Sequence, residues 1–365
     1  MPTVEVDLGD RSYTISIEAG ALARLGEVVA TARPTAVLVV SNPVVAGHYG
    51  EAAISSLQDA GLRSDLMCLP AGERFKTLNS VKKIYDALLQ SHIDRKGAVV
   101  ALGGGVIGDM AGFAAASYLR GVDFYQVPTT LLAQVDASVG GKVGVDLPQG
   151  KNLVGAFHQP KAVVVDTSTL HTLPARELRS GLAEVVKHGI IYDQDFLIFL
   201  NQNAARLLSR SEAEMVRAVR RSVEIKRDIV VNDERESGIR AILNYGHTIG
   251  HAIEVLSGYG RYRHGEAVAI GMVTEAILSE MEGIAPKGTA GIVAESLIQM
   301  RLPADIDASL PTERVIRAIE LDKKTLGGVL RLALPVEVGK CSVAEVSREA
   351  LTAAIEAHKA RRFQK

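Results

Sequence analysis

Residues 98–109 read AVVALGGGVIGD, a run that combines a buried strand, a glycine turn and the start of a helix. The part before the glycines is apolar throughout, which is typical of a strand covered on both faces of a parallel sheet. Gly103, Gly105 and Gly108 then match the G-x-G-x-x-G pattern, in which backbone amides at a helix N-terminus bind a pyrophosphate. The run therefore predicts a Rossmann-like α/β domain with a dinucleotide site.

This match departs from the usual dinucleotide fingerprint in two ways. It follows a late strand of the domain rather than the first one. Asp123, the acidic residue about twenty positions further on, begins the next strand instead of ending it. A glycine-rich junction between strand and helix also occurs for packing alone, so the match by itself is weak. We expect dinucleotide binding in a non-standard arrangement.

The residues on either side of this run alternate between strand and helix patterns. Val4–Leu8 and Tyr13–Ile17 alternate apolar and polar residues and predict a hairpin. Continuous apolar strands separated by helices then predict a mostly parallel sheet with helices on both faces. The expected strands are Ala36–Val40, Asp65–Leu69, Ala98–Leu102, Phe124–Val127 and Ala162–Val165, and the expected helices are Val44–Ala60, Thr77–Ser91 and Val106–Ser117.

The strand patterns nearly vanish in the second half of the chain. Pro174 and the run of Thr and Ser before it mark the change. Two domains are therefore expected, an α/β domain over residues 1–172 and an all-α domain over residues 173–365. The expected helices are Arg176–Ile191, Glu212–Val231, His247–Leu256 and Glu266–Glu282, with Leu330–Leu334 as a strand-like exception.

The composition limits the classes of protein to which the chain can belong. The chain has 365 residues, 47% of them hydrophobic, which suits about two domains with large cores. A net charge of -1 gives no general affinity for nucleic acid or for an anionic membrane. Cys68 and Cys341 are the two cysteines and argue against a disulfide framework. The N-terminus has no secretory pattern, so the expected location is the cytoplasm, with no nucleic-acid or membrane partner.

The His-rich run that ends near residue 266 suggests metal chemistry. His247 and His251 lie one helical turn apart, and His264 is a third imidazole close by in the sequence. Neutral imidazoles at this spacing bind zinc well. A lone pair of His would fit an amphipathic helix equally well. Arg240 and Asn244 in the same run would hold an anionic, hydroxyl-rich ligand near such an ion.

Two further segments carry polar groups at suggestive spacings. Residues 181–189 read GLAEVVKHG and place Glu184, Lys187 and His188 on one helical face. A surface ion pair is the commoner reason for such spacing, but Glu184 would complete a Glu/His/His metal set with a position open for substrate. Residues 128–152 form a polar, glycine-rich segment whose lysines suit a phosphate or carboxylate, with a solvated loop as the alternative.

Taken in order, these motifs resemble the 3-dehydroquinate synthase family of the shikimate pathway. The resemblance runs over nearly the whole chain and rests on PAGERFKT, GGGVIGD, PTTLLAQVDASVGGK, GKN, GLAEVVKHG, LNYGHTIGHAIE and RHGEAV. No single motif is decisive, but their order and content together are highly specific. The resemblance implies NAD and zinc or cobalt as cofactors, a homodimer, and 3-deoxy-D-arabino-heptulosonate 7-phosphate as the substrate.

The resemblance also implies roles for individual residues. The metal ligands would be Glu184, His247 and His264, while His251 would accept a proton from the substrate. The implied catalytic residues are His251, Lys142, Lys187, Asn152 and Asp136. The implied substrate contacts are Lys142, Lys151, Asn152, Lys187, Lys226, Arg240, Asn244, His251 and the pair Lys323 and Lys324, of which one would face the substrate. The implied NAD contacts are Asn42, Glu73, Lys76, Gly103, Gly104, Gly105, Val106, Asp109, Thr129, Thr130, Asp136, Lys142 and Lys151.

The implied reaction passes a hydride to NAD and back, with phosphate elimination, ring opening and aldol closure in the same turnover. Three other readings remain open. Another sugar phosphate cyclase would act on a substrate without the carboxylate and is expected to differ at positions such as Lys226, Arg240 and Asn244. A metal-dependent polyol dehydrogenase would release NADH. A non-catalytic metal-binding protein would leave the phosphate and dinucleotide features unused.

Overall fold

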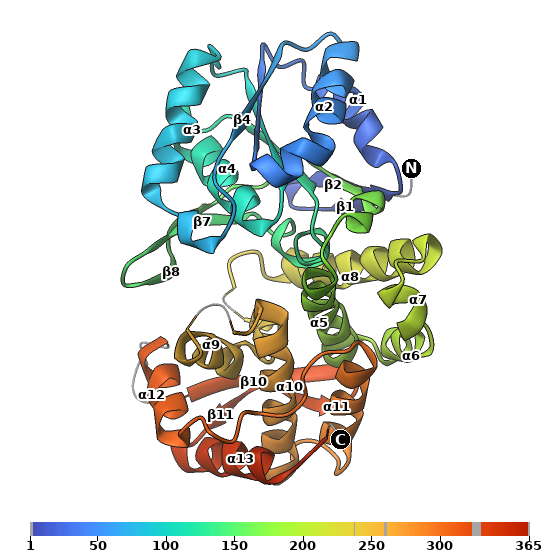
Figure 1. Cartoon of the computed structure of the whole chain (residues 1–365), viewed down its shortest axis with the longest axis vertical. Coiled ribbons are helices and arrows are strands. Elements are labelled where there is room, and N and C mark those ends of the chain that lie inside the picture. Colours follow the sequence, from blue (N-terminus) through green and yellow to red (C-terminus); the bar gives the residue numbers. More distant parts are fainter. Residues whose placement is uncertain (1–2, 237, 259–260, 323–329, 364–365) are drawn as a thin grey trace. The chain divides into compact units, whose positions relative to one another are not determined.

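The computed structural model describes residues 3–236, 238–258, 261–322 and 330–363 (Figure 1). Contacts between Cα atoms divide the chain into two compact units. The first unit is Met1–Leu173 with Met215–Arg227, and the second is Pro174–Glu214 with Asp228–Lys365. The middle of helix α8 (Glu212–Asn232) is thus grouped with the first unit, whereas the sequence analysis assigned residues 173–365 as a whole to the second domain.

The first unit is built on a seven-stranded sheet of order β1-β2-β9-β6-β5-β3-β4. β1 runs antiparallel to β2, and the other neighbouring strands are parallel. This confirms the expected mostly parallel sheet with an N-terminal hairpin. The strands are β1 (Thr3–Val6), β2 (Tyr13–Glu18), β3 (Val37–Ser41), β4 (Ser64–Cys68), β5 (Ala98–Gly103), β6 (Asp123–Pro128) and β9 (Ala162–Asp166).

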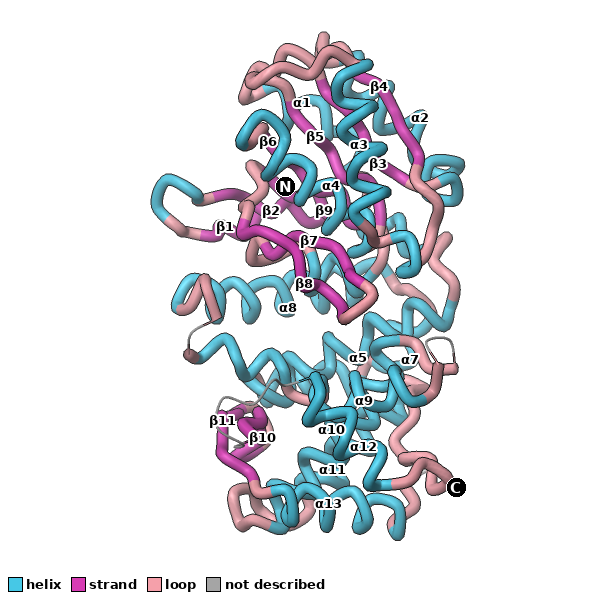
Figure 2. The backbone as a smooth tube through the Cα atoms, turned by 90° about the vertical axis from the view of Figure 1, so that its left-hand side faces the viewer, coloured by secondary structure: helices cyan, strands magenta, loops and turns pink. Residues whose placement is uncertain are grey.

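Helices cover both faces of this sheet, as the apolar strands predict (Figure 2). Side chains alternate along each strand, so neighbours enter opposite cores. Leu38 of β3 belongs to the core that includes α3 and α4, whereas Val39 belongs to the core that includes α1 and α2. The four helices are α1 (Leu25–Ala30), α2 (Pro43–Asp59), α3 (Leu78–Gln90) and α4 (Gly105–Ser117).

The glycine-rich segment, for which a solvated loop was the alternative interpretation, contributes to an antiparallel hairpin, β7 (Lys142–Leu147) and β8 (Gly150–Phe157). Val143 and Val145 of β7 are buried in the core beside α4. Gly144 permits close approach of the two strands, since a Cβ there would lie 2.6 Å from the carbonyl oxygen of Val154. The solvated-loop alternative does not hold for the hairpin, because the glycines there allow backbone contact rather than freedom of the chain.

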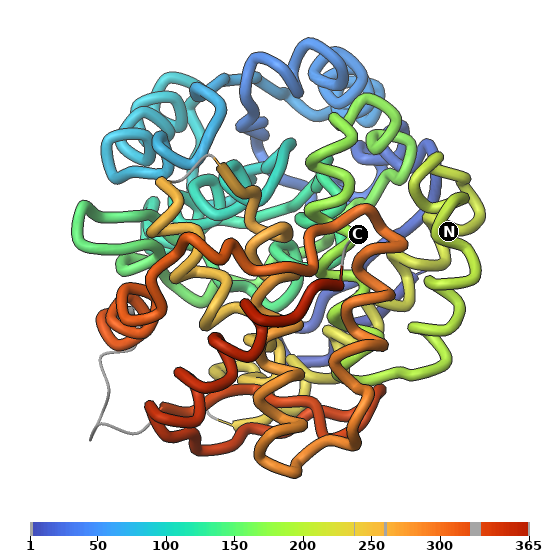
Figure 3. Tube along the Cα trace, turned by 60° about the horizontal axis from the view of Figure 1, so that its bottom comes forward, coloured from blue at the N-terminus to red at the C-terminus, as the bar shows by residue number. Residues whose placement is uncertain are grey.

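The second unit is mainly helical, as expected, and its C-terminal part is orange to red in Figure 3. It also contains one two-stranded antiparallel sheet, whose first strand includes the strand-like Leu330–Leu334. The second strand was not expected from the sequence. The elements are α5 (Ala175–Tyr192), α6 (Gln194–Gln202), α7 (Ala204–Leu208), α9 (His247–Leu256), α10 (His264–Met281), α11 (Thr289–Gln299), α12 (Thr312–Asp322), β10 (Leu330–Glu337), β11 (Lys340–Val346) and α13 (Arg348–Ala360).

Glycines bring α9 against α10. A Cβ on Gly271 of α10 would lie 2.0 Å from the carbonyl oxygen of Gly246, and a Cβ on Gly250 of α9 would lie 3.0 Å from Val268. Because these positions carry only hydrogen, the two helix backbones can approach closely. The contact matters for function, since each helix begins with a candidate metal ligand.

Within the described part of the chain, no helix combines the length and the apolar character needed to cross a membrane.

Candidate active site

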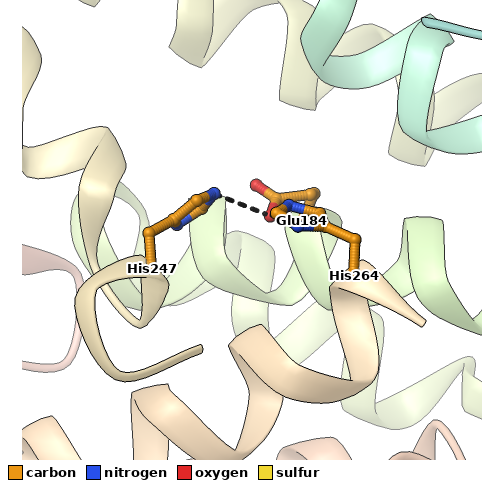
Figure 4. A group of neighbouring side chains, drawn as sticks. All are labelled: Glu184, His247 and His264. Atoms are coloured by element: carbon orange, nitrogen blue, oxygen red, sulfur yellow. Dashed lines mark ion pairs between the residues drawn. The ribbon is translucent and has the colours of Figure 1, made fainter. Parts of the chain in front are cut away.

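The three residues proposed as metal ligands come together in the second unit (Figure 4). One ligand atom from each of Glu184, His247 and His264 lies within 4.8 Å of the others. Nε2 of His247 is 3.6 Å, and Nε2 of His264 is 3.7 Å, from Oε1 of Glu184. Ligand atoms around a tetrahedral zinc lie roughly 3.4 Å apart, so small shifts would bring these three onto one ion.

Three different helices supply these ligands. Glu184 lies within α5, while His247 and His264 are the first residues of α9 and α10. The turn into α9 depends on Gly246, whose φ of 80° lies in the left-handed region. Two of the three candidate ligands therefore begin helices whose backbones are held close by the glycine contact between α9 and α10.

Charge around the triad is balanced by a lysine. Glu184 is fully buried and forms an ion pair with Lys187, one helical turn away on α5. Nζ of Lys187 also donates a hydrogen bond of 2.7 Å to the carbonyl oxygen of Leu243. A buried carboxylate needs such a partner, because burial without one is costly. One carboxylate with two imidazoles is a donor set that zinc and cobalt accept, so the residues fit a divalent metal.

The protonation state of His247 suits metal binding. Burial, followed by the positive charge of Lys187, holds the pKa of His247 well below its ordinary value. The imidazole is therefore neutral near pH 7, as a metal ligand must be. Nδ1 of His247 lies 3.1 Å from the carbonyl oxygen of Tyr245, to which it donates, and Nε2 keeps its lone pair toward Glu184.

His251 lies beside the triad. Its ring centroid is 5.5 Å from that of His247 and 5.9 Å from that of His264. Among the described residues, the groups with metal-ligand spacing that contain Glu184 do not include His251. His251 is grouped instead with Glu254 and His264. This placement is compatible with a separate role in proton transfer.

The anion-binding candidates of the second unit precede α9 in the 3₁₀ helix Ile239–Asn244. Arg240 is 3% exposed, and its side chain donates to the backbone oxygen of Glu234. The backbone N–H of Arg240 donates to Asp233 Oδ2 at 3.0 Å, and Asn244 Nδ2 donates to Glu236 Oε1 at 2.8 Å. No sequence pattern pointed to these acidic partners, because each lies across a turn rather than at a helical spacing.

The first unit also holds a cluster of charged and polar side chains. Nζ of Lys76 lies 2.5 Å from Oδ2 of Asp109 and also donates to Oδ1 of Asn152. Desolvation raises the pKa of Asp109 to about 6, against the opposing charge of Lys76. Asn152 is held in turn by Asp146, whose Oδ1 accepts from the Asn152 N–H at 2.8 Å. Three residues proposed for cofactor or substrate thus meet in one place.

The GGG turn lies where the sequence predicts. Gly103 ends β5, and Gly105 begins α4. In the described residues no side chain caps the N-terminus of α4, so its first amides can donate to an anion. A Cβ on Gly104 would lie 3.0 Å from the side chain of Thr130, which places a proposed cofactor residue directly against the turn.

Asp136 and Lys226 form a second pair within the first unit. Nζ of Lys226 donates to the backbone oxygen of Asp136 at 2.5 Å and to its Oδ1 at 2.6 Å. The pairing joins an implied NAD contact to an implied substrate contact, ninety positions apart in the sequence.

The other predicted residues are distributed as follows. Asn42 caps α2 through its side-chain oxygen, which accepts from Val44 and Val45 N–H groups at 3.1 Å. Glu73 and Lys142 are exposed, and Thr129 is buried. Lys323 and Lys324 lie outside the described residues. Lys151 lies in β8, and Val106 lies in α4.

Comparisons of the sequence with known proteins agree on one family. Its sequence models match in two parts, 3-dehydroquinate synthase N-terminal over residues 66–180 and 3-dehydroquinate synthase C-terminal over residues 181–325. The 3-dehydroquinate synthase of Nostoc punctiforme is 46% identical over 347 residues, which cover 94% of this chain and 95% of that protein.

Solved structures of sugar phosphate cyclases share the fold. A 2-deoxy-scyllo-inosose synthase, complexed with carbaglucose-6-phosphate, NAD+ and Co2+, has a TM-score of 0.90 at 26% identity and covers 98% of this chain and 100% of that one. The 2-epi-5-epi-valiolone synthase of Streptomyces hygroscopicus subsp. jinggangensis, with NAD+ and Zn2+ bound, has a TM-score of 0.88 at 27% identity, covering 98% and 99%. With both parts of the family matched in order along one chain, this protein belongs to the 3-dehydroquinate synthase family.

Proposed function

We propose that this chain converts 3-deoxy-D-arabino-heptulosonate 7-phosphate to 3-dehydroquinate and phosphate. The observation that carries the proposal is the Glu184–His247–His264 group, on the same unit as the anion-binding candidates Arg240 and Lys187. Its support is the 46% identity to a 3-dehydroquinate synthase over nearly the whole chain. The product is an intermediate of aromatic amino acid biosynthesis.

The proposed metal is zinc or cobalt, held by Glu184, His247 and His264. When bound, a divalent ion supplies Lewis acidity that makes a substrate hydroxyl easier to deprotonate. His251 lies beside the ligands and accepts that proton as a general base. His251 lies one helical turn after His247, which would keep it close to the same substrate hydroxyls. It does not belong to the ligand group that contains Glu184.

The proposed dinucleotide is NAD, bound in the first unit. The amides at the start of α4 would hold its pyrophosphate, since a helix N-terminus favours anions. Lys76 and Asp109 lie near this turn and would fix the position of the dinucleotide. When bound, NAD would supply reversible hydride transfer within one turnover, so the net reaction would be an elimination with ring closure and not an oxidation. The further proposed contacts are Asn42, Glu73, Thr129, Thr130, Asp136, Lys142 and Lys151.

The proposed substrate carries a carboxylate, a phosphate and neighbouring hydroxyls, and the residue types suit each part. Arg240 presents a planar guanidinium that can pair with a carboxylate through two hydrogen bonds. Lysines act as point charges toward the phosphate and lower the cost of its departure. The proposed set is Lys142, Lys151, Asn152, Lys187, Lys226, Arg240 and Asn244, with one of Lys323 and Lys324.

The test supplies the heptulosonate phosphate with zinc and an amount of NAD far below the substrate. We expect inorganic phosphate and 3-dehydroquinate in equal amounts, both far exceeding the NAD present, because the cofactor is regenerated in each turnover. Phosphate at background level would sink the proposal. Stoichiometric NADH with simple polyols would favour the dehydrogenase reading instead.

A second substrate distinguishes the proposed activity from that of related cyclases. Glucose 6-phosphate lacks the carboxylate that the proposed substrate offers to Arg240, and we expect no phosphate release from it. Turnover of this sugar phosphate at a rate near that of the heptulosonate would favour a cyclase of the inosose type.

Two further expectations belong to the same proposal: the protein forms a homodimer, and it is located in the cytoplasm. Sedimentation velocity at micromolar concentration tests the first, since a monomeric mass would contradict it. Cell fractionation tests the second.

A further inference from the structure

Glu254 lies at the end of α9 with its carboxylate against a candidate metal ligand. Its Oε2 is 3.3 Å from Nδ1 of His264, and its side chain is 9% exposed. An ionised carboxylate only accepts hydrogen bonds, so Nδ1 of His264 must be the donor. The ring then carries its proton on the side of Glu254 and keeps the lone pair of Nε2 toward Glu184, 3.7 Å away.

The other candidate imidazole ligand, His247, is oriented by a backbone hydrogen bond. Nδ1 of His247 donates to the carbonyl oxygen of Tyr245, which belongs to the backbone of the preceding turn. Both rings therefore present Nε2 to the same carboxylate oxygen. His247 is held by a neutral backbone group close in sequence, whereas His264 is held by a charged side chain from another helix.

We propose that Glu254 is a positioning residue for the metal: it fixes the tautomer and the ring plane of His264 and raises the basicity of Nε2. A carboxylate behind a metal-bound imidazole commonly has this effect, and its loss weakens metal binding about 10–100-fold. The proposal rests on the proposed function, because it takes Glu184, His247 and His264 as the metal ligands. It assigns Glu254 no contact with the substrate.

The geometry separates this role from direct ligation. Glu254, His251 and His264 also have ligand atoms within 4.8 Å of one another. The Glu254 oxygen lies on the Nδ1 side of His264, however, while Glu184 lies on the Nε2 side. The two nitrogens of an imidazole point away from each other, so Glu184 and Glu254 cannot share one ion through a single nitrogen of His264.

The test compares two variants with a matched control. Glu254→Ala removes the acceptor, and Glu254→Gln keeps a neutral acceptor without the charge. Glu280→Ala is the control, because Glu280 has a side-chain exposure of 10% and accepts the N–H groups of Gly288 and Ala290 at 2.9 and 2.8 Å, at the other end of α10. Zinc affinity is measured by chelator competition on the protein alone, without NAD or substrate.

We expect Glu254→Ala to bind zinc about 10–100-fold more weakly, Glu254→Gln to fall between it and the parent, and Glu280→Ala to stay within about twofold. The cobalt-loaded variants should keep the visible absorption bands of the parent, because the ligand set is unchanged. Thermal melting of the metal-free proteins checks folding, and the Gln variant keeps the test decisive if the Ala variant does not fold.

Two results would overturn the proposal. Affinity of Glu254→Ala within about twofold of the parent would leave Glu254 without a role at the metal. Loss of binding beyond about a thousandfold, with altered cobalt bands, would make it a direct ligand. Because no substrate is used, this outcome is independent of the phosphate-release test: a parent protein that binds zinc as expected but releases no phosphate would contradict the proposed function alone.

Discussion

At the residue scale, one helical turn separates the two histidines for which we propose different roles. His247 faces Glu184, whereas His251 lies beside that group and is associated with Glu254 and His264. Burial depresses the pKa of His247 and keeps it ready to bind a metal. The proposed division between a metal ligand and a proton acceptor therefore predicts opposite results for substitutions at neighbouring histidines.

For His264→Ala we expect activity to vanish together with bound metal, because one of three protein ligands is lost. Metal content after dialysis, measured by atomic emission, and phosphate release check this. A variant with the parent's metal content would remove His264 from the ligand set.

For His251→Ala we expect metal content to be retained while turnover falls about 10²–10⁴-fold, since the variant lacks a proton acceptor. The same two measurements apply, with His264→Ala as the contrasting variant. Loss of metal from His251→Ala would contradict the role in proton transfer.

At the element scale, the close contact of α9 and α10 sets the distance between two candidate ligands. Gly271→Ala would place a Cβ 2.0 Å from the carbonyl oxygen of Gly246. We expect a loss of about 1–3 kcal/mol in the free energy of unfolding, as for overpacked cores, and weaker metal binding because the turn before His247 shifts.

Gly291→Ala on α11 is the matched control, since nothing lies within 4 Å of a Cβ there. Helix propensity alone predicts about 0.5–1 kcal/mol of added stability for it. Urea unfolding measures both variants. Equal effects of the same sign would show that the α9–α10 contact does not limit stability.

His358 connects α13 to neighbouring segments through two hydrogen bonds. Its environment leads us to expect that the folded state is less stable in acid. Its Nδ1 lies 2.7 Å from Oγ1 of Thr274, and its Nε2 lies 2.8 Å from the carbonyl oxygen of Ala304. Desolvation is the main cause that lowers the pKa of His358 to about 4, with Asp305 raising it and Arg361 lowering it by their charges.

The folded-state pKa is below the unfolded value of about 6.5, so the unfolded chain binds the proton more readily. The stability that neutral His358 contributes is complete above about pH 6.5 and falls as the pH drops toward 4. Between about pH 7.5 and pH 5 the expected loss is about 2 kcal/mol, measured by urea unfolding at both pH values. The variant His358→Gln should lose this part of the pH dependence; an unchanged dependence would contradict the assignment.

At the scale of the whole molecule, metal binding should stabilise the folded chain. An ion that binds only the folded state adds about 2.7 kcal/mol at a free concentration of one hundred times Kd. We expect zinc to raise the urea midpoint accordingly in the parent protein and not in His264→Ala. An equal rise in both would indicate zinc binding elsewhere.

Much of the fold follows from local patterns. The strands β3, β5, β6 and β9 can be predicted from apolar runs in the sequence, because central parallel strands are buried on both faces. The His and Glu spacings are readable because helical periodicity places residues on one face. The hairpin β7–β8 was not readable, since the same glycines suit a loop and a close strand contact.

What the sequence by itself determined is the order of the main strands and helices, the glycine turn and, through the family resemblance, the identity of the candidate ligands. Only the tertiary structure decided which nitrogen of each imidazole faces Glu184, that the Glu184–Lys187 pair is buried, and that Glu254 lies behind His264. The physical reason is range. Periodicity relates residues a few positions apart, whereas hydrogen bonds between helices depend on how closely their backbones pack, and here glycine contacts set that distance.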